Sequence, residues 1–135
     1  MDAIVSQLTA NVEPNEILDE IAAQQILKEM DFAVPADYVE YMFLKNGGEG
    51  AIGEEGYIRL WMLQELMEAN QDYAVQEFAP GLFLIGSDGG DAAYGLRKDD
   101  LAFIEVPFIG MSIHEVKVLG YDFAEFLQAI ANRGL

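Results

Sequence analysis

The sequence predicts an α+β fold, with a central, mostly antiparallel sheet and flanking helices. Two amphipathic helical segments come first, short apolar segments separated by turn residues fill the middle, and a strongly apolar helical segment closes the chain. Helices grouped apart from strands favour α+β over alternating βαβ units. With 135 residues, of which 52% are hydrophobic, the chain is expected to form one domain over residues 1–135 with its own core.

The first half of the chain contains two predicted helices after a weakly patterned stretch, residues 1–13. Apolar residues recur at three- and four-residue steps over residues 18–26, which predicts an amphipathic helix from Pro14 to about residue 30. A second helix is expected to begin at Pro35 and to end at Asn46-Gly47, since these residue types adopt the left-handed conformation that terminates helices.

Apolar segments of period-two character, bounded by glycine, proline and acidic residues, predict the strands. These strands are expected at residues 57–61, 82–87, 92–97, 101–106 and 113–119. A short helix is expected at residues 63–70, a connection at 71–81 and a hairpin turn at 98–100. The last helix is expected at residues 122–133, with Asp122 at its start as in a capping box.

The chain is strongly acidic, because 24 Asp and Glu residues face only seven Lys and Arg, for a net charge of −17. Direct binding to nucleic acid is not expected, since it depends on Lys and Arg that neutralise phosphates, and an anionic membrane is disfavoured for the same reason. Such a field attracts a basic protein partner and speeds its association. The alternative, that acidity only keeps a small protein in solution, stays open from composition alone.

Nothing in the sequence suggests export or membrane insertion. Residues 1–5 lack the basic and apolar regions of a signal peptide, and no segment approaches 18 uninterrupted apolar residues. The chain has no cysteine, which excludes disulfides and thiolate chemistry and fits a reducing compartment. A cytoplasmic location is therefore expected.

Two glycine-rich, acid-bearing corners, residues 46–50 and 85–91, are the most distinctive local features. Residues 48–53 match the letters G-x-G-x-x-G, but they follow a helix and carry acids that repel phosphate, so nucleotide binding is not expected. Asp88 and Asp91 lack the further oxygen ligands of a calcium loop and are better explained as residues of a tight hairpin. No cofactor and no metal are expected.

The sequence offers little support for catalysis. Ser87 does not lie in a G-x-S-x-G motif, and the single histidine, His114, has no local partner of a catalytic triad. Trp61, the only tryptophan, is either a core anchor or an interface residue, because tryptophan is enriched in interfaces. A noncatalytic binding protein is the favoured interpretation.

An ordered set of short motifs resembles the SUKH superfamily, the Smi/Knr-type proteins. The matching segments are residues 34–38 (an L-P-x-x-Y-like helix start), 46–50 (an N-G-G corner), 60–70 (strand, tryptophan and helix), 84–90 (I-G-x-D-G-G), 106–107 and 123–127. Together the resemblance covers about residues 16–131. Val34 in place of leucine, Met62 in place of a capping serine and Asp122 in place of serine depart from the pattern, although aspartate still caps a helix.

The resemblance implies a Smi/Knr-like α+β fold and a bacterial immunity protein, which binds and neutralises a cognate toxin of a polymorphic or contact-dependent system. A nuclease toxin agrees with the acidic charge, because such toxins are commonly basic where they hold nucleic acid. Eukaryotic relatives act as regulatory or scaffold proteins, so an intracellular adaptor is the alternative, and a small hydrolase that uses Ser87 or paired acids is a third hypothesis. The sequence leaves the oligomeric state open.

If the chain binds a basic toxin domain, its contact groups are expected around the two glycine corners, provided that these loops face one side of the molecule. Carboxylates there would imitate the phosphates of nucleic acid, and Trp61 would supply an aromatic anchor. The expected partner-binding residues are Glu49, Glu54, Glu55, Trp61, Asp88, Asp91, Asp99 and Asp100.

Overall fold

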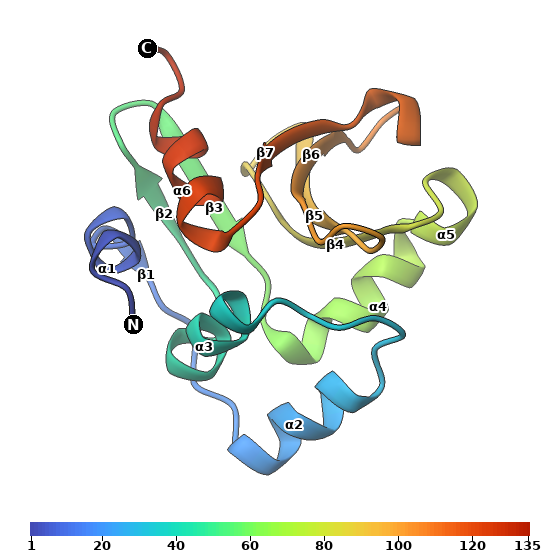
Figure 1. Cartoon of the computed structure of the whole chain (residues 1–135), viewed down its shortest axis with the longest axis horizontal. Helices are drawn as coiled ribbons and strands as arrows, with labels where there is room; N and C mark the ends of the chain where they lie inside the picture. Colours follow the sequence, from blue (N-terminus) through green and yellow to red (C-terminus); the bar gives the residue numbers. More distant parts are fainter.

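A computed structural model describes residues 1–135 and places seven antiparallel strands in one sheet, in the order in which they follow along the chain (Figure 1). The strands are β1 (Val12–Glu13), β2 (Gly48–Ile52), β3 (Gly56–Leu60), β4 (Leu82–Ser87), β5 (Ala92–Arg97), β6 (Phe103–Pro107) and β7 (Lys117–Gly120). The helices are α1 (Ala3–Leu8), α2 (Glu20–Lys28), α3 (Ala36–Lys45), α4 (Leu63–Asp72), α5 (Val75–Phe78) and α6 (Phe123–Ala131), and one 3-10 turn is η1 (Ile113–Glu115). The predicted α+β fold is confirmed. None of these helices combines the length and the apolar character needed to cross a bilayer.

Where capping and turn residues are strong, the predicted boundaries agree with the structure. β4 and β5 begin and end at the predicted residues. α3 ends at Asn46, whose φ of 51° is the left-handed conformation expected there. α6 begins after Asp122, whose carboxylate accepts a hydrogen bond from the Glu125 N–H at 2.7 Å.

The predicted boundaries are wrong where an element is short or is defined by a distant contact. Residues 1–13 contain α1 and β1, and β1 exists only through the pairing of two residues with β2. α2 begins at Glu20 rather than near Pro14, because the Asp19 side chain caps the helix by accepting a hydrogen bond from the Ala22 N–H. The connection 71–81 contains α5, and the strand predicted at 113–119 begins only at Lys117, after η1.

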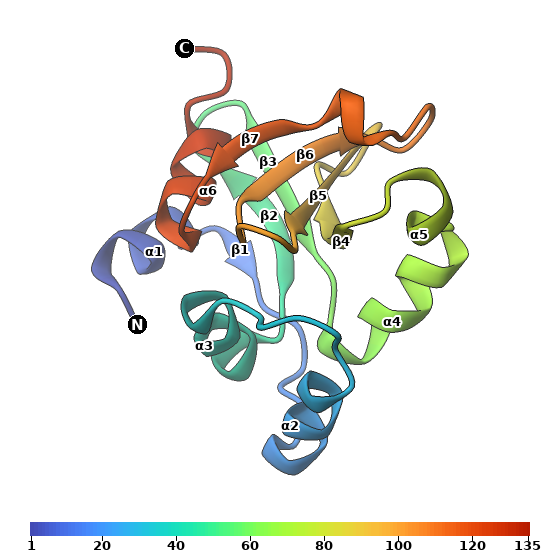
Figure 2. The same cartoon turned by 45° about the vertical axis from the view of Figure 1, so that its right-hand side comes forward.

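Two hydrophobic clusters lie on the two faces of the central strands. The larger has 20 buried residues and packs α3 and α6 against the sheet. The smaller has nine buried residues and packs α5 against β4, β5 and β6. The neighbouring β4 residues Phe83 and Leu84 belong to different clusters, so this strand is covered on both faces; α4 and α5 lie beside it, and α6 lies against β3 and β7 (Figure 2).

The end of α3 is organised by one buried side chain, Asn46. Its Oδ1 accepts a hydrogen bond from the Leu63 N–H at 2.9 Å, at the start of α4. Its Nδ2 donates to the carbonyl of Glu16 at 2.9 Å and to Oε1 of Gln64 at 3.1 Å. A single amide group therefore joins the segment before α2, the end of α3 and the start of α4.

Gly47 places this corner directly against the end of β3. Its φ is +87°, and a Cβ atom there would lie 2.4 Å from the carbonyl oxygen of Leu60 and 2.8 Å from that of Trp61. Only glycine combines this conformation with such close backbone approach. The Asn15 side chain closes the corner by donating to the carbonyl of Asn46 at 3.0 Å.

Replacing Asn46 with alanine is expected to lower the free energy of unfolding by about 3 kcal/mol, because it leaves buried hydrogen-bonding groups unpaired and puts alanine in the left-handed region. Chemical denaturation measures the change. Asn132→Ala, at the exposed end of α6, is the matched control and should change the free energy by less than about 0.5 kcal/mol. A loss below about 1 kcal/mol for Asn46→Ala would contradict this account of the corner.

Candidate functional site

A row of three side chains points outward from β3 and its end. Along the strand, Ile58 and Leu60 are buried while Tyr57 and Arg59 are exposed. Trp61 continues this alternation just after the strand and is partly exposed. Because successive side chains of a strand point to opposite faces, Tyr57, Arg59 and Trp61 share the outer face.

Glu49 of β2 holds the first two members of this row in place. It pairs with Arg59 in the sheet register, and its carboxylate accepts hydrogen bonds from the Tyr57 hydroxyl at 2.5 Å and from the Arg59 guanidinium at 3.0 Å. The Arg59 hydrogen bond, followed by that of Tyr57, lowers the pKa of the Glu49 carboxyl, and the bond to Glu49 raises the pKa of the Tyr57 hydroxyl. The hydrogen bonds among Glu49, Tyr57 and Arg59 therefore hold these three exposed side chains in one arrangement.

Trp61 lies at the meeting point of two shallow grooves. One groove, of about 340 Å³, is lined by Asn15, Gly48, Glu49, Arg59, Leu60, Trp61 and Glu65. The next, of about 410 Å³, is lined by Trp61, Glu65, Ala69, Asp72 and Tyr73. Both share Trp61 and Glu65, so the depression continues across the tryptophan from the sheet onto α4.

An aromatic row extends from Trp61 toward the turn between β4 and β5. The Trp61 and Tyr73 rings are stacked, with centroids 6.1 Å apart and planes 10° apart, and the Tyr73 and Phe108 centroids are 4.7 Å apart. The Phe108 N–H donates to the carbonyl of Asp91 at 3.0 Å. We call the outer face formed by Glu49, Tyr57, Arg59, Trp61, Glu65, Tyr73 and Phe108 the Trp61 surface.

Four of the predicted acidic residues lie in turns at the same end of the strands. In an antiparallel meander, alternate turns lie at the same end of the strands. The β2–β3 turn with Glu54 and Glu55 therefore lies at the same end of the sheet as the β4–β5 turn with Asp88 and Asp91. A Cβ on Gly89, between these aspartates, would lie 3.1 Å from the Tyr57 ring. The β4–β5 turn therefore borders the Trp61 surface, whereas the Glu55 side chain lies beside Gly134, after the end of α6.

The remaining pair, Asp99 and Asp100, lies in the β5–β6 turn at the opposite end of the strands. The condition that all the acidic loops lie on one side of the molecule is therefore not met, because the β5–β6 turn lies at the other end of the strands from the β2–β3 and β4–β5 turns. The first glycine corner also differs from expectation, since Glu49 lies in β2 and not in a loop.

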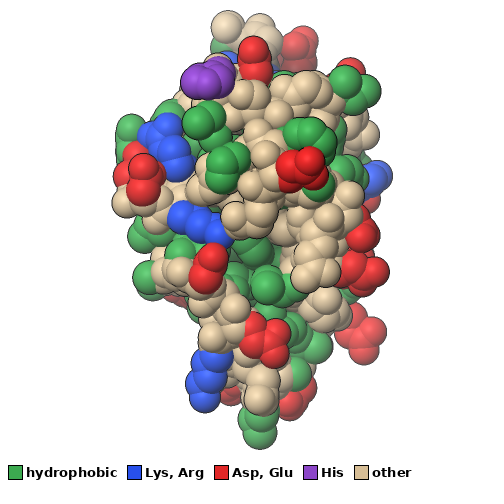
Figure 3. All heavy atoms as spheres, turned by 90° about the vertical axis from the view of Figure 1, so that its right-hand side faces the viewer, with side chains coloured by type: hydrophobic (Ala, Val, Ile, Leu, Met, Phe, Trp, Pro, Cys, Tyr) green, Lys and Arg blue, Asp and Glu red, His purple; other side chains and the backbone are tan.

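Several of the singled-out polar groups are already used by the fold. Asp88 Oδ1 accepts hydrogen bonds from the Gly90 N–H at 2.8 Å and the Ala92 N–H at 3.2 Å, which shapes the turn. The Ser87 hydroxyl accepts from the Gly89 N–H at 3.1 Å. His114 is exposed on η1, on the face shown in Figure 3, and no hydrogen bond joins it to Ser87. Residues of the chain form no cluster of three or more metal-ligating side chains.

The sequence interpretation missed five residues of this surface, Tyr57, Arg59, Glu65, Tyr73 and Phe108. Tyr57 and Arg59 could have been found from the alternation of β3, which exposes every second residue of a predicted strand. Tyr73 and Phe108 gave no such signal, because they come from the end of α4 and from the loop after β6 and meet only in three dimensions.

The Asp100 carboxylate is expected to stay ionised to unusually low pH. Its pKa is lowered from 3.8 to about 2, chiefly by the hydrogen bond from Arg97, whose guanidinium lies 2.7 Å away. Since the folded pKa lies below the unfolded one, this group's contribution to stability is present above about pH 4 and is lost as the pH falls toward 2.

Arg97→Gln should return the Asp100 pKa toward 3.8, as measured by an NMR titration of the carboxyl carbon. Arg59→Gln, which removes an equivalent charge from a different arginine–carboxylate pair, is the control and should leave the Asp100 pKa unchanged. An Asp100 pKa that stays near 2 in the Arg97 variant would show that the guanidinium is not the cause.

Comparison with known proteins places the chain in a family. The sequence model of the SMI1 / KNR4 family (SUKH-1) matches residues 17–129, which include every strand after β1 and most of the helices. No curated protein matches the sequence. The matched range agrees with the extent of the motif resemblance and contains the whole Trp61 surface. The chain therefore belongs to the SMI1 / KNR4 family (SUKH-1).

Proposed function

We propose that this chain is a noncatalytic protein-binding module, acting as an immunity protein that binds and neutralises a cognate toxin domain of a bacterial polymorphic or contact-dependent system. Family membership is consistent with such a module. The observation that carries the proposal is the outward row of Tyr57, Arg59 and Trp61 on β3. The whole chain, residues 1–135, is proposed to act as one binding unit in the cytoplasm.

The chemistry of this row is that of an interface centre. Tryptophan, tyrosine and arginine are the residues most enriched among those that dominate binding energy. Glu49 holds Tyr57 and Arg59 in one arrangement, and Tyr73 stacks on Trp61, so little side-chain entropy remains to be lost on binding. The shallow grooves on either side of Trp61 would accept side chains of the partner.

The charge around this surface favours a basic partner. Glu65 and Asp72 line the grooves, and the β4–β5 turn, which contains Asp88 and Asp91, borders Tyr57. Carboxylates at the rim of an interface mainly increase the association rate and do so in a salt-dependent way. Asp99 and Asp100, at the other end of the strands, would contribute only through the overall electrostatic field of a chain with net charge −17.

The direct test is to tag the protein in its native host, capture it from a low-salt lysate and identify what co-purifies. A basic toxin domain at a one-to-one ratio, released as salt is raised, is the expected result. A regulatory or cell-wall protein without any toxin would replace the immunity proposal with the adaptor alternative. An enzymatic activity of the isolated chain that Ser87→Ala abolishes would overturn the noncatalytic proposal.

With the captured partner in hand, Arg59→Ala and Trp61→Phe should each weaken binding, and Arg59→Ala should raise the Kd about 30-fold, equivalent to about 2 kcal/mol. Arg97→Ala is the matched control, because Arg97 is also an ion-paired arginine on a strand but lies at the end of β5, beside the β5–β6 turn. Calorimetry gives the Kd, and thermal melting verifies that each variant is folded. Equal losses for Arg59 and Arg97 would contradict a localised centre.

Neutralising acidic residues of the β2–β3 and β4–β5 turns should lower the association rate with the partner without much change in the dissociation rate. The double variant Glu54→Gln with Asp91→Asn removes one charge from each of the β2–β3 and β4–β5 turns, and Glu20→Gln with Asp99→Asn removes two exposed charges that line neither groove beside Trp61. The first is expected to reduce the association rate about five-fold at low salt and to flatten its salt dependence, and the second much less. Surface plasmon resonance over a salt series distinguishes them, and identical behaviour would assign the effect to net charge alone.

A further inference from the structure

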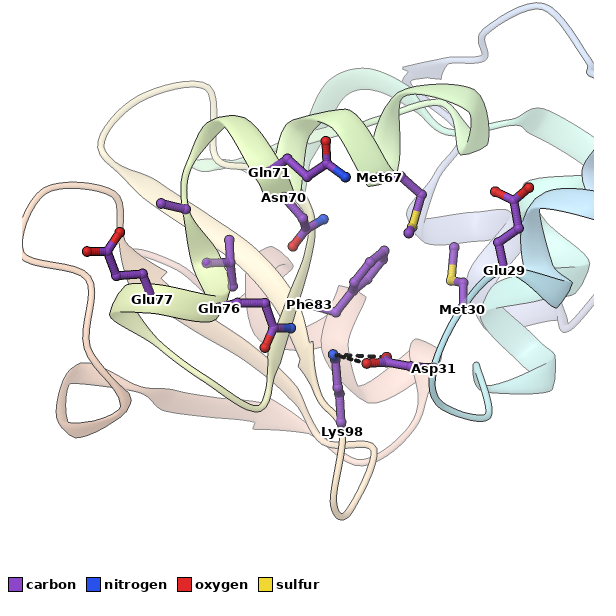
Figure 4. Close-up of a pocket in the computed structure, with 12 residues that line it drawn as sticks. Glu29, Met30, Asp31, Met67, Asn70, Gln71, Gln76, Glu77, Phe83 and Lys98 are labelled. Atoms are coloured by element: carbon purple, nitrogen blue, oxygen red, sulfur yellow. Dashed lines mark hydrogen bonds and ion pairs between the residues drawn. The ribbon is translucent and has the colours of Figure 1, made fainter.

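A second groove lies on the other side of α4 from the Trp61 surface. It has a volume of about 440 Å³ and is bounded by the end of α2, by α4 and α5, and by β4 (Figure 4). Glu65, Ala69 and Asp72 of α4 face the Trp61 surface, whereas Met67, Asn70 and Gln71 face this groove. Because the two sets lie on different sides of one helix, the groove is separate from the site of the proposed function and does not depend on it.

The floor of this groove is apolar and adaptable. Phe83 of β4 is buried beneath it, and the partly exposed Met30 and Met67 side chains point toward each other beside that ring (Figure 4). Methionine is flexible and polarisable, so such a floor can adjust to different aliphatic or aromatic groups. Its volume is within the range of cavities that hold small ligands or single anchoring side chains.

Two of the three amides on the groove wall are free to bind. Asn70 is fully used by the fold, since it bonds the carbonyls of Leu66 and Leu84 and the Leu84 N–H at 2.8–2.9 Å. The side chains of Gln71 and Gln76 make no hydrogen bond within the chain and are exposed. An extended peptide backbone offers the N–H and carbonyl groups that such amides pair with.

Acidic residues line the groove on both sides, and the Glu77 carboxylate is directed outward from α5 (Figure 4). Glu29 and Asp31 come from the end of α2, and Glu77 comes from α5 on the opposite side (Figure 4). The one cation of the lining, Lys98, is already paired with Asp31 at 2.9 Å and lies over the Phe32 ring. An occupant that is cationic at both ends and apolar in the middle therefore complements the groove.

We propose that this groove binds a short peptide segment of a protein partner, in which an apolar pair is flanked on both sides by lysine or arginine. The apolar pair would lie on Met30, Met67 and Phe83, and the flanking cations would lie near Glu29 and Glu77. A second copy of this chain is a poor occupant, because two molecules of net charge −17 repel each other.

Three acetylated, amidated tetrapeptides test the proposal by NMR on the labelled full chain at low salt: Arg-Leu-Leu-Arg, Arg-Ser-Ser-Arg and Glu-Leu-Leu-Glu. The first should shift the side-chain amide signals of Gln71 and Gln76 and the methyl signals of Met30 and Met67. At the same concentration the other two should give less than about a fifth of these shifts, because each lacks one half of the complementarity.

Matched double variants separate the rim from the overall charge. Glu29→Gln with Glu77→Gln should weaken the binding of Arg-Leu-Leu-Arg about five-fold, whereas Glu13→Gln with Glu115→Gln, which removes the same charge elsewhere, should leave it nearly unchanged. All four positions are exposed, so neither variant should impair folding.

Four results would overturn the proposal. They are equal shifts with Arg-Ser-Ser-Arg, which would indicate attraction by charge alone; shifts confined to residues outside the groove; equal weakening by the two double variants; and groove signals that move with protein concentration alone, which would identify a second copy of the chain as the occupant.

Discussion

The hydrogen bonds of the buried Asn46 side chain hold together the three segments that meet at the end of α3. They join the segment before α2 to the start of α4, while Gly47 brings the same corner against the carbonyls of Leu60 and Trp61. The start of β2 is therefore fixed against the end of β3, which sets the register that places Glu49 opposite Arg59. The geometry of the Trp61 surface follows from a corner that contributes no side chain to its outer row.

α4 is the second constraint, because its three sides have three different environments. Leu63 and Leu66 are buried in the larger hydrophobic cluster, and Asn70 bonds the backbone of β4, so the helix is held firmly on the sheet. Its two remaining sides each line a groove with acidic residues at the rim. A rigid helix between two grooves gives an acidic protein two separate places at which to meet cationic partners, each with its own apolar contacts.

Local chemistry explains which parts could be predicted from sequence. The Asn46-Gly47 helix end, the Asp122 cap and the boundaries of β4 depend on residue types whose preferences are strong by themselves. β1 and α5 could not be predicted, because a two-residue strand and a single helical turn form only through contacts with distant segments. The same distinction applies to the site: Trp61 and Glu49 were identified, whereas the partners that give them their geometry come from other elements.

The most direct test of the Trp61 surface is hydroxyl-radical footprinting of the complex with the captured partner, read at individual aromatic side chains. Tyr57, Trp61 and Tyr73 are all at least partly exposed in the free chain, so each should be oxidised when the protein is alone. The account predicts that all three become protected in the complex, while the exposed Tyr121, which follows β7, keeps its rate. Unchanged oxidation of Tyr57, Trp61 and Tyr73 in a fully formed complex would contradict the assignment of this surface as the binding site.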